Sequence, residues 1–103
     1  MIRGTTPTHI FKTNADLSDA TEIYITYEQG TTVVEKTIED CTIDTVDEKS
    51  SITVKLTQEE TLSFANSGYR ADVQIRVKFA DGTAMASNIL NVPVSKILKD
   101  GEI

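Results

Sequence analysis

A run of alternating apolar and polar residues between Ala71 and Phe79 constrains the fold of this chain more than any other feature. Successive side chains of a β-strand point to opposite faces, so the run predicts a strand with one apolar face and one charged face. Such a strand has a core on one side and water on the other, which is typical of antiparallel sheets. The Asp81-Gly82 pair that follows tolerates positive φ angles and predicts a tight hairpin.

Several other segments alternate in the same way, and turn residues separate them. The predicted strands cover residues 7–12, 22–29, 31–39, 41–46, 51–56, 71–79 and 83–94. Strands spaced by about ten residues, with turn signals between them, favour a sandwich or a barrel. We therefore expect one domain over residues 1–103, folded as an all-β, immunoglobulin-like antiparallel β-sandwich of about seven strands. Residues 95–103 form either a frayed end of the last strand or a C-terminal arm that docks elsewhere.

One short helical segment interrupts the strands. Thr57 and Glu60 have the spacing of a capping box, in which a Thr hydroxyl accepts from the third helical amide and the Glu reaches back to the cap. We expect one or two helical turns over residues 58–64 that end near residues 66–68. We interpret this segment as a crossover that caps and connects two sheets.

Length, composition and charge limit the possible functions. The chain has 103 residues, and its formal net charge is −6. An acidic chain is poorly suited to neutralise phosphates, so we expect no nucleic-acid binding and no docking on anionic lipid. The N-terminus lacks the apolar region of a signal peptide, and no apolar run approaches the ~20 residues that span a bilayer. We expect synthesis in the cytosol without export by the general secretory route.

The residues that catalysis would require are few. His9 and Cys41 are the only histidine and the only cysteine, and the chain has no nucleophile-elbow sequence. The anionic neighbours of Cys41 suppress its thiolate, and its place in an alternating strand suits a small buried residue. We expect His9 to be a strand residue that is packed or hydrogen-bonded near the end of the sheet, and we expect no enzyme.

The sequence also gives no clear cofactor or metal site. One Cys and one His cannot supply the usual four zinc ligands. Four acidic residues cluster in sequence and could supply oxygen ligands to calcium: Asp40, Asp44, Asp47 and Glu48. The spacing of an EF-hand is absent, so a solvated acidic loop is the better interpretation. We expect no cofactor and no metal.

Three segments resemble a known family. They are Met1 to His9 (Met-Ile-Arg-Gly-Thr-Thr-Pro-Thr-His), Lys55 to Leu62 (Lys-Leu-Thr-Gln-Glu-Glu-Thr-Leu) and Lys99 to Gly101 (Lys-Asp-Gly). In these segments the chain resembles small uncharacterised prophage proteins of Gram-positive bacteria that are encoded among tail and baseplate genes. The resemblance covers most of the chain, and its motifs are structural rather than catalytic. It implies a role in virion structure or assembly in a bacterial host, a place in the virion, and no catalytic residue.

The C-terminal region offers the candidate contact residues. Pro93 cannot donate to a ladder, which predicts an edge, a bulge or a strand end there. An unpaired edge can be extended by a neighbouring chain, and an apolar arm can dock on one. We hypothesise that this region contacts other phage structural proteins or a second copy, and the candidate residues are Pro93, Ile97, Leu98 and Ile103.

A second function class stays open. Many β-sandwiches are carbohydrate- or ligand-binding modules. In this chain such a site would use loops that carry Tyr24, Tyr27 or Tyr69, or the acidic segment from Asp40 to Glu48.

Overall fold

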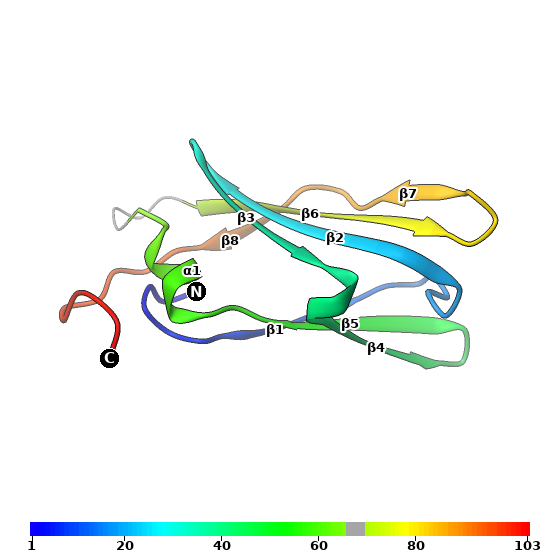
Figure 1. Cartoon of the computed structure of the whole chain (residues 1–103), viewed down its shortest axis with the longest axis horizontal. Coiled ribbons are helices and arrows are strands. Elements are labelled where there is room, and N and C mark those ends of the chain that lie inside the picture. The colour runs from blue at the N-terminus through cyan, green and yellow to red at the C-terminus, as the bar shows by residue number, and fades with distance from the viewer. Residues whose placement is uncertain (66–69) are drawn as a thin grey trace.

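The computed structural model describes residues 1–65 and 70–103, and it consists of two β-sheets packed face to face (Figure 1). The smaller sheet contains β1 (Thr8–Lys12), β5 (Lys49–Lys55) and β4 (Cys41–Val46), in that order. The larger sheet contains β3 (Thr32–Thr37), β2 (Ala20–Gln29), β6 (Arg70–Phe79) and β7 (Ala84–Ala86), and β8 (Leu90–Pro93) also pairs with β6. The 3₁₀ turn η1 (Ile38–Asp40) and the helix α1 (Gln58–Leu62) connect strands of different sheets.

The order of the strands is that of an immunoglobulin-like sandwich. If β1 is strand B, the smaller sheet has the order B-E-D and the larger has the order C′-C-F-G, with β7 and β8 together in the place of strand G. All pairs between named strands are antiparallel. The predicted all-β, immunoglobulin-like sandwich is confirmed, with eight strands where about seven were expected. Among the described residues, the smaller sheet has no strand in the position of strand A.

The core lies between the sheets and is built mainly on the apolar faces of β2 and β6. Ile25 lies directly opposite Ile75, and Tyr27 lies opposite Val73. All four side chains are buried. Each residue between them points to the outer face, because successive side chains alternate. The alternation predicted for residues 71–79 is therefore confirmed.

The third strand is shorter than predicted, because a side chain ends it. The sequence predicts a strand over residues 31–39, but β3 ends at Thr37 and η1 follows. An Asp40 carboxylate oxygen accepts from the Thr37 amide at 2.9 Å, which closes the turn. Lys36 and Val34 share one face of β3, and both are buried.

The predicted last strand over residues 83–94 is also wrong as a single element, because a bulge divides it. Arg76 opposes Ala86, whereas Val73 opposes Leu90. Residues 74–75 of β6 therefore face residues 87–89, one more than the ladder can pair. The Ser87 amide donates to the Ile75 carbonyl at 2.8 Å, and the Ser87 hydroxyl accepts from the Ile75 amide at 3.0 Å.

Two hairpin turns differ in their backbone φ angles, and their sequences do not predict this difference. The turn between β6 and β7 is a hairpin as predicted, but only Gly82 has a positive φ, 90°. The Phe79 amide donates to the Thr83 carbonyl at 2.8 Å, which leaves a three-residue loop. Both central residues have positive φ at a different turn, between β4 and β5, where Asp47 has φ 52° and Glu48 has φ 63°.

The capping box at Thr57 is confirmed. The Thr57 hydroxyl accepts from the Glu60 amide at 3.1 Å, and the Glu60 carboxylate accepts from the Thr57 amide at 2.8 Å. The helix ends at Leu62 instead of residue 64. Thr61 and Phe64 are buried under the sheets, whereas the helix end expected at residues 66–68 lies outside the described residues. Within residues 1–65 and 70–103, no helix is long and apolar enough to cross a membrane.

The carboxylate of Glu60 also neutralises a lysine at the edge of the core. The Lys36 ammonium lies 2.6 Å from the Glu60 carboxylate, and both side chains are largely buried. Two charges removed from water are tolerated when they are paired and hydrogen-bonded. One carboxylate thus caps α1 and anchors it against β3.

Replacing Glu60 tests this pairing. Glu60→Gln keeps an oxygen that can accept from the Thr57 amide but leaves the Lys36 charge without a counter-ion. Breaking a fully buried pair costs roughly 3–5 kcal/mol, and we expect a loss of about 2 kcal/mol in the free energy of unfolding here, because Glu60 remains partly exposed. The double variant with Lys36→Met should recover much of that loss in urea unfolding. Additive losses in the double-mutant cycle would contradict the pairing.

Candidate functional site

The first and last described segments of the chain lie side by side at one end of the molecule, next to α1 (Figure 1). Residues 1–3 run parallel to residues 93–95. The Met1 amino group donates to the Pro93 carbonyl at 2.7 Å, the Ser95 amide donates to the Met1 carbonyl at 2.8 Å, and the Arg3 amide donates to the Ser95 carbonyl at 3.1 Å. These bonds add a short parallel segment to the larger sheet beside the end of β8.

Pro93 is therefore at a strand end, but its edge is not free. Its carbonyl points away from β6 and accepts from Met1. The N–H that proline lacks would point in the same direction, so its absence costs no bond with β6. The strand end predicted at Pro93 is confirmed, whereas the unpaired edge expected there is wrong because residues 1–3 cover it.

Ile97 packs against the N-terminal segment instead of extending into solvent. Gly4 has φ 74°, and a Cβ at that position would lie 2.9 Å from Ile97 Cδ1 and 3.4 Å from Leu62 Cδ2. The backbone at Gly4 thus approaches two apolar side chains more closely than any other residue would allow. Ile97 is half-buried in this contact.

A few polar contacts hold the rest of the C-terminal segment. The Gln58 side chain donates to the Ile103 carbonyl at 3.0 Å and accepts from the Ile103 amide at 2.9 Å. Arg3 donates to the carbonyls of Phe64 and Leu62 at 2.6 and 2.9 Å, which satisfies groups left free where α1 ends. The Arg3 guanidinium also lies 3.9 Å from the exposed Asp100 carboxylate, a weak pair.

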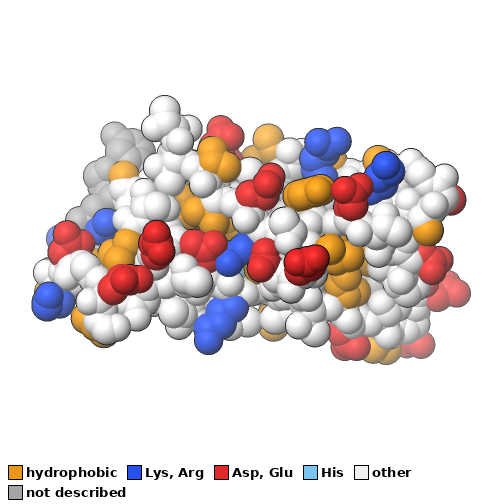
Figure 2. Space-filling model, viewed as in Figure 1, with side chains coloured by type: hydrophobic (Ala, Val, Ile, Leu, Met, Phe, Trp, Pro, Cys, Tyr) orange, Lys and Arg blue, Asp and Glu red, His pale blue; other side chains and the backbone are white. Residues whose placement is uncertain are grey.

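Two apolar side chains of this segment are the most exposed large hydrophobic ones among the described residues. Leu98 is 95% exposed and Ile103 is 91% exposed. Ile2, in the neighbouring N-terminal segment, is half exposed. Figure 2 shows one face of the molecule, which is mainly polar, with acidic side chains along its middle and hydrophobic ones in separate places.

A hydrogen bond between two side chains joins the two sheets inside the sandwich. His9 of β1 is half-buried, and its Nδ1 lies 2.7 Å from the Tyr27 hydroxyl of β2. Burial lowers the pKa of His9 below its ordinary value, and the positive N-terminal amino group lowers it further. Burial raises the pKa of Tyr27, which stays neutral. As predicted, His9 is a packed and hydrogen-bonded strand residue, and its bond crosses to the other sheet.

Cys41 is similarly inert. Its thiol donates to the Thr37 carbonyl at 3.2 Å. Burial raises the pKa of the Cys41 thiol, and the Asp40 carboxylate beside it raises it further. A thiol with a raised pKa is a poor nucleophile at neutral pH. The raised thiol pKa predicted from the acidic neighbours is confirmed, although burial is the larger cause.

The acidic segment and the tyrosines do not converge on a binding site. Asp40 closes η1, and hydrogen bonds from Thr37 lower the pKa of its carboxyl. In the described part of the chain, no group of three or more His, Cys, Asp or Glu side chains is placed to hold a metal ion. Tyr24 and Tyr27 lie in β2 and not in loops as that hypothesis required, and Tyr69 lies outside the described residues.

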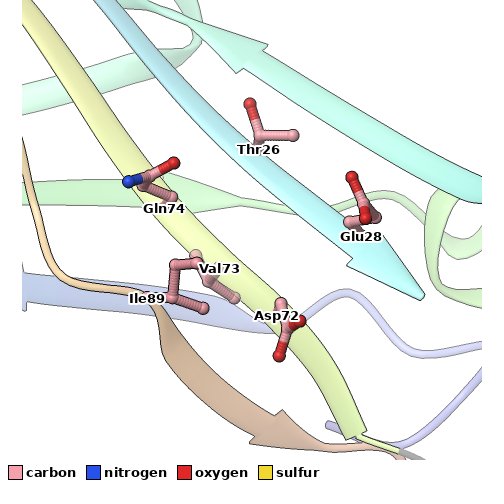
Figure 3. A pocket seen from close by; sticks show the side chains of 6 residues that line it. All are labelled: Thr26, Glu28, Asp72, Val73, Gln74 and Ile89. Atoms are coloured by element: carbon pink, nitrogen blue, oxygen red, sulfur yellow. The ribbon is translucent and has the colours of Figure 1, made fainter. Parts of the chain in front are cut away.

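A shallow hollow lies on the outer face of the larger sheet. Its volume is about 170 Å³, and Figure 3 shows the side chains that line it: Thr26, Glu28, Asp72, Val73, Gln74 and Ile89. This is smaller than the roughly 300–1,000 Å³ of a typical ligand pocket. Glu28 lies directly opposite Asp72 in the register of β2 and β6, so two like charges meet at its rim.

The buried histidine predicts a pH dependence of stability. The pKa of His9 is lower in the folded protein than its ordinary value of 6.5, so the unfolded chain binds more protons between the two values. His9 therefore contributes stability that is fully present above pH 6.5 and is lost as the pH falls through its folded pKa. Between pH 7 and 5, the free energy of unfolding of the wild type should fall more steeply than that of His9→Gln. Parallel profiles would contradict this.

The close approach at Gly4 predicts a specific sensitivity. Gly4→Ala should destabilise the fold by about 1–2 kcal/mol, because it adds strain at positive φ and a clash with Ile97. Gly30→Ala is the matched control, since Gly30 has φ 58° but nothing lies within 4 Å of its added Cβ. Ile97→Ala should partly rescue Gly4→Ala in thermal unfolding and should not rescue Gly30→Ala. Equal effects of the two glycine variants would show that Ile97 does not pack there.

Comparisons of this chain with protein-family models, with curated proteins and with solved structures find no match.

Proposed function

We propose that this chain is a non-enzymatic structural or assembly component of a phage tail or baseplate that acts through protein–protein contacts. The observation that carries the proposal is the exposure of Leu98 and Ile103 in a segment that contains neither helix nor strand. Large apolar side chains that stand this far into solvent are suited to burial in a contact. Burying one such side chain contributes roughly 1.5–3 kcal/mol.

The surroundings of these side chains favour contacts with protein. The C-terminal segment is held in place by the Gln58 clamp on Ile103 and by the packing of Ile97 on Gly4. This keeps Leu98 presented at the surface at little further entropic cost. The partner is either another phage structural protein or a second copy of the chain.

The phage part of the proposal is supported by the sequence resemblance of residues 1–9, 55–62 and 99–101 to prophage proteins encoded among tail and baseplate genes. A sandwich with exposed strand edges is compatible with it, because edges allow subunits to extend one another. In the described residues β3 and β4 each pair with a neighbour on one side only. Mass spectrometry of purified particles from an induced host should detect the chain at a fixed ratio to tail proteins; its absence from both particles and assembly intermediates would contradict the assignment.

Removing the C-terminal segment tests the contact itself. Deletion of residues 95–103 should abolish self-association, or binding to a purified tail partner, as measured by light scattering after size exclusion over a concentration series. Unchanged association together with unchanged folding would rule out this segment as the contact.

The deletion also removes the Ser95 bonds to residues 1–3, so a gentler variant is needed alongside it. Leu98→Glu combined with Ile103→Glu changes only exposed side chains and should weaken association to a similar extent. Val46→Glu is the control, since Val46 is 62% exposed and ends β4, whereas the C-terminal segment lies at the other end of the molecule beside α1 (Figure 1). Equal weakening by the control would point to a general effect of charge.

A further inference from the structure

Within residues 1–65 and 70–103, no strand pairs with the outer edge of β1. The larger sheet has the order β3-β2-β6 followed by β7 and β8, whereas the smaller has only β4, β5 and β1. In the immunoglobulin order, strand A would pair with strand B, here β1, and would lie under strand G, here β7 and β8. Residues 1–3 do not fill this place, because they pair with residues 93–95 of the larger sheet. We call the empty place beside β1 the vacant strand position.

The exposed fractions of the side chains on the inner face of β7 and β8 show which part of that face has no strand packed against it. The side chains at residues 85, 90, 92 and 94 share the inner face, because Met85 and Leu90 lie opposite buried residues of β6 and the alternation continues from Leu90. Val94, next to residues 1–3, is 4% exposed, but Leu90 is 45% exposed and Met85 is 42% exposed. Apolar side chains that point toward a core and remain this exposed lack a neighbour on one side.

The edge of β1 next to this position has backbone N–H and C=O groups that point away from β5. The Leu56 amide donates to the Pro7 carbonyl, and the Thr13 amide donates to the Ser50 carbonyl, so the odd-numbered residues of this ladder bond to β5. The backbone groups of Thr8, Ile10 and Lys12 therefore point to the vacant strand position. The Ile10 side chain, on the outer face, is 60% exposed.

We propose that the C-terminal segment of a second copy, residues 95–103, occupies the vacant strand position by pairing with β1. This inference rests on the proposed function and names the surface to which the segment binds. Its apolar pattern fits, because consecutive side chains of a strand point to opposite faces. Of Ile97 and Leu98, one would lie under Met85 and Leu90, and the other would lie beside Ile10 on the outer face.

Two carboxylates lie near the start of β7, the strand that would cover the vacant strand position. A hollow of about 280 Å³ adjoins the start of β7 and is lined by Phe79, Thr83, Ala80 and two carboxylates, Asp19 and Asp81. The incoming segment carries Lys96 and Lys99 on either side of its two apolar residues. Lysines next to carboxylates help to fix the direction and register of a docked strand.

Donor and acceptor surfaces are different parts of the same chain, so the contact is head-to-tail. Such contacts close into rings or continue as filaments, depending on the rotation between copies. Docking on a second copy requires the segment to leave its own chain. It must release the Ser95 bonds to residues 1–3, the packing of Ile97 on Gly4 and the bonds of Ile103 to Gln58.

Sedimentation of the full-length chain from about 1 µM to 1 mM, with Ile10→Pro and Ile10→Thr, tests the proposal. Proline at residue 10 removes an N–H that faces the vacant strand position and leaves the β5 ladder intact, whereas threonine keeps that N–H. We expect the dissociation constant to rise at least about tenfold for Ile10→Pro, which corresponds to roughly 1.4 kcal/mol. Ile10→Thr should change it much less. If circular dichroism shows that Ile10→Pro does not fold, Met85→Lys replaces it.

A second measurement uses the acetylated peptide of residues 95–103 as the probe. In NMR titrations of the full-length chain we expect chemical-shift changes of the amides of Thr8, Ile10 and Lys12. These changes should be lost in the acceptor variant, which is Ile10→Pro or, if that does not fold, Met85→Lys. Shifts confined to other residues, or none at millimolar peptide, would overturn the proposal. If deleting residues 95–103 abolishes association but the acceptor variants do not weaken it, the vacant strand position is not the receptor and the proposed function stands. If the deletion leaves association unchanged, both the proposed function of the C-terminal segment and the proposed receptor are wrong.

Discussion

Ile25 and Ile75 face each other across β2 and β6, and their neighbours Ile23 and Tyr27 continue the same buried row. This paired apolar surface is the interaction on which the rest of the structure depends. The strands of the smaller sheet, too short to be stable alone, bury their inner faces against it. Each crossover, including η1 and α1, then serves to carry the chain from one sheet to the other while keeping that surface covered.

Features set by neighbouring residues could be predicted from the sequence, and features set by distant ones could not. The alternation in β2 and β6 and the cap at Thr57 depend on residues a few positions apart, so pattern and spacing were sufficient. The ends of β3 and of the predicted strand over residues 83–94 depend on an aspartate that closes a turn and on a register shift against β6. Neither has a signature in the local pattern. The positive φ angles at Asp47 and Glu48 likewise occur without glycine or asparagine, which are the usual signals.

The exposure of some candidate contact residues could likewise be predicted from neighbouring residues, whereas that of others depends on distant ones. Exposure of Leu98 and Ile103 accords with their polar surroundings in the sequence. Ile97 has the same surroundings but is half-buried, because Gly4 lies against it from the opposite end of the chain. The pairing of residues 1–3 with residues 93–95 could not be read from so short a segment. The vacant strand position is less visible still, since it becomes apparent only when the two sheets are compared.

The parallel pairing of the two chain ends has a consequence for the order of folding. The bond between Met1 and Pro93 joins residues 92 positions apart, so it closes a long loop. Contacts of such separation form late, after the hairpins and the paired sheets. A few bonds near the surface are also the first to open in the native state. The edge at Pro93 is therefore shielded by the least cooperative part of the structure, and its availability is set by local fluctuation rather than by global unfolding.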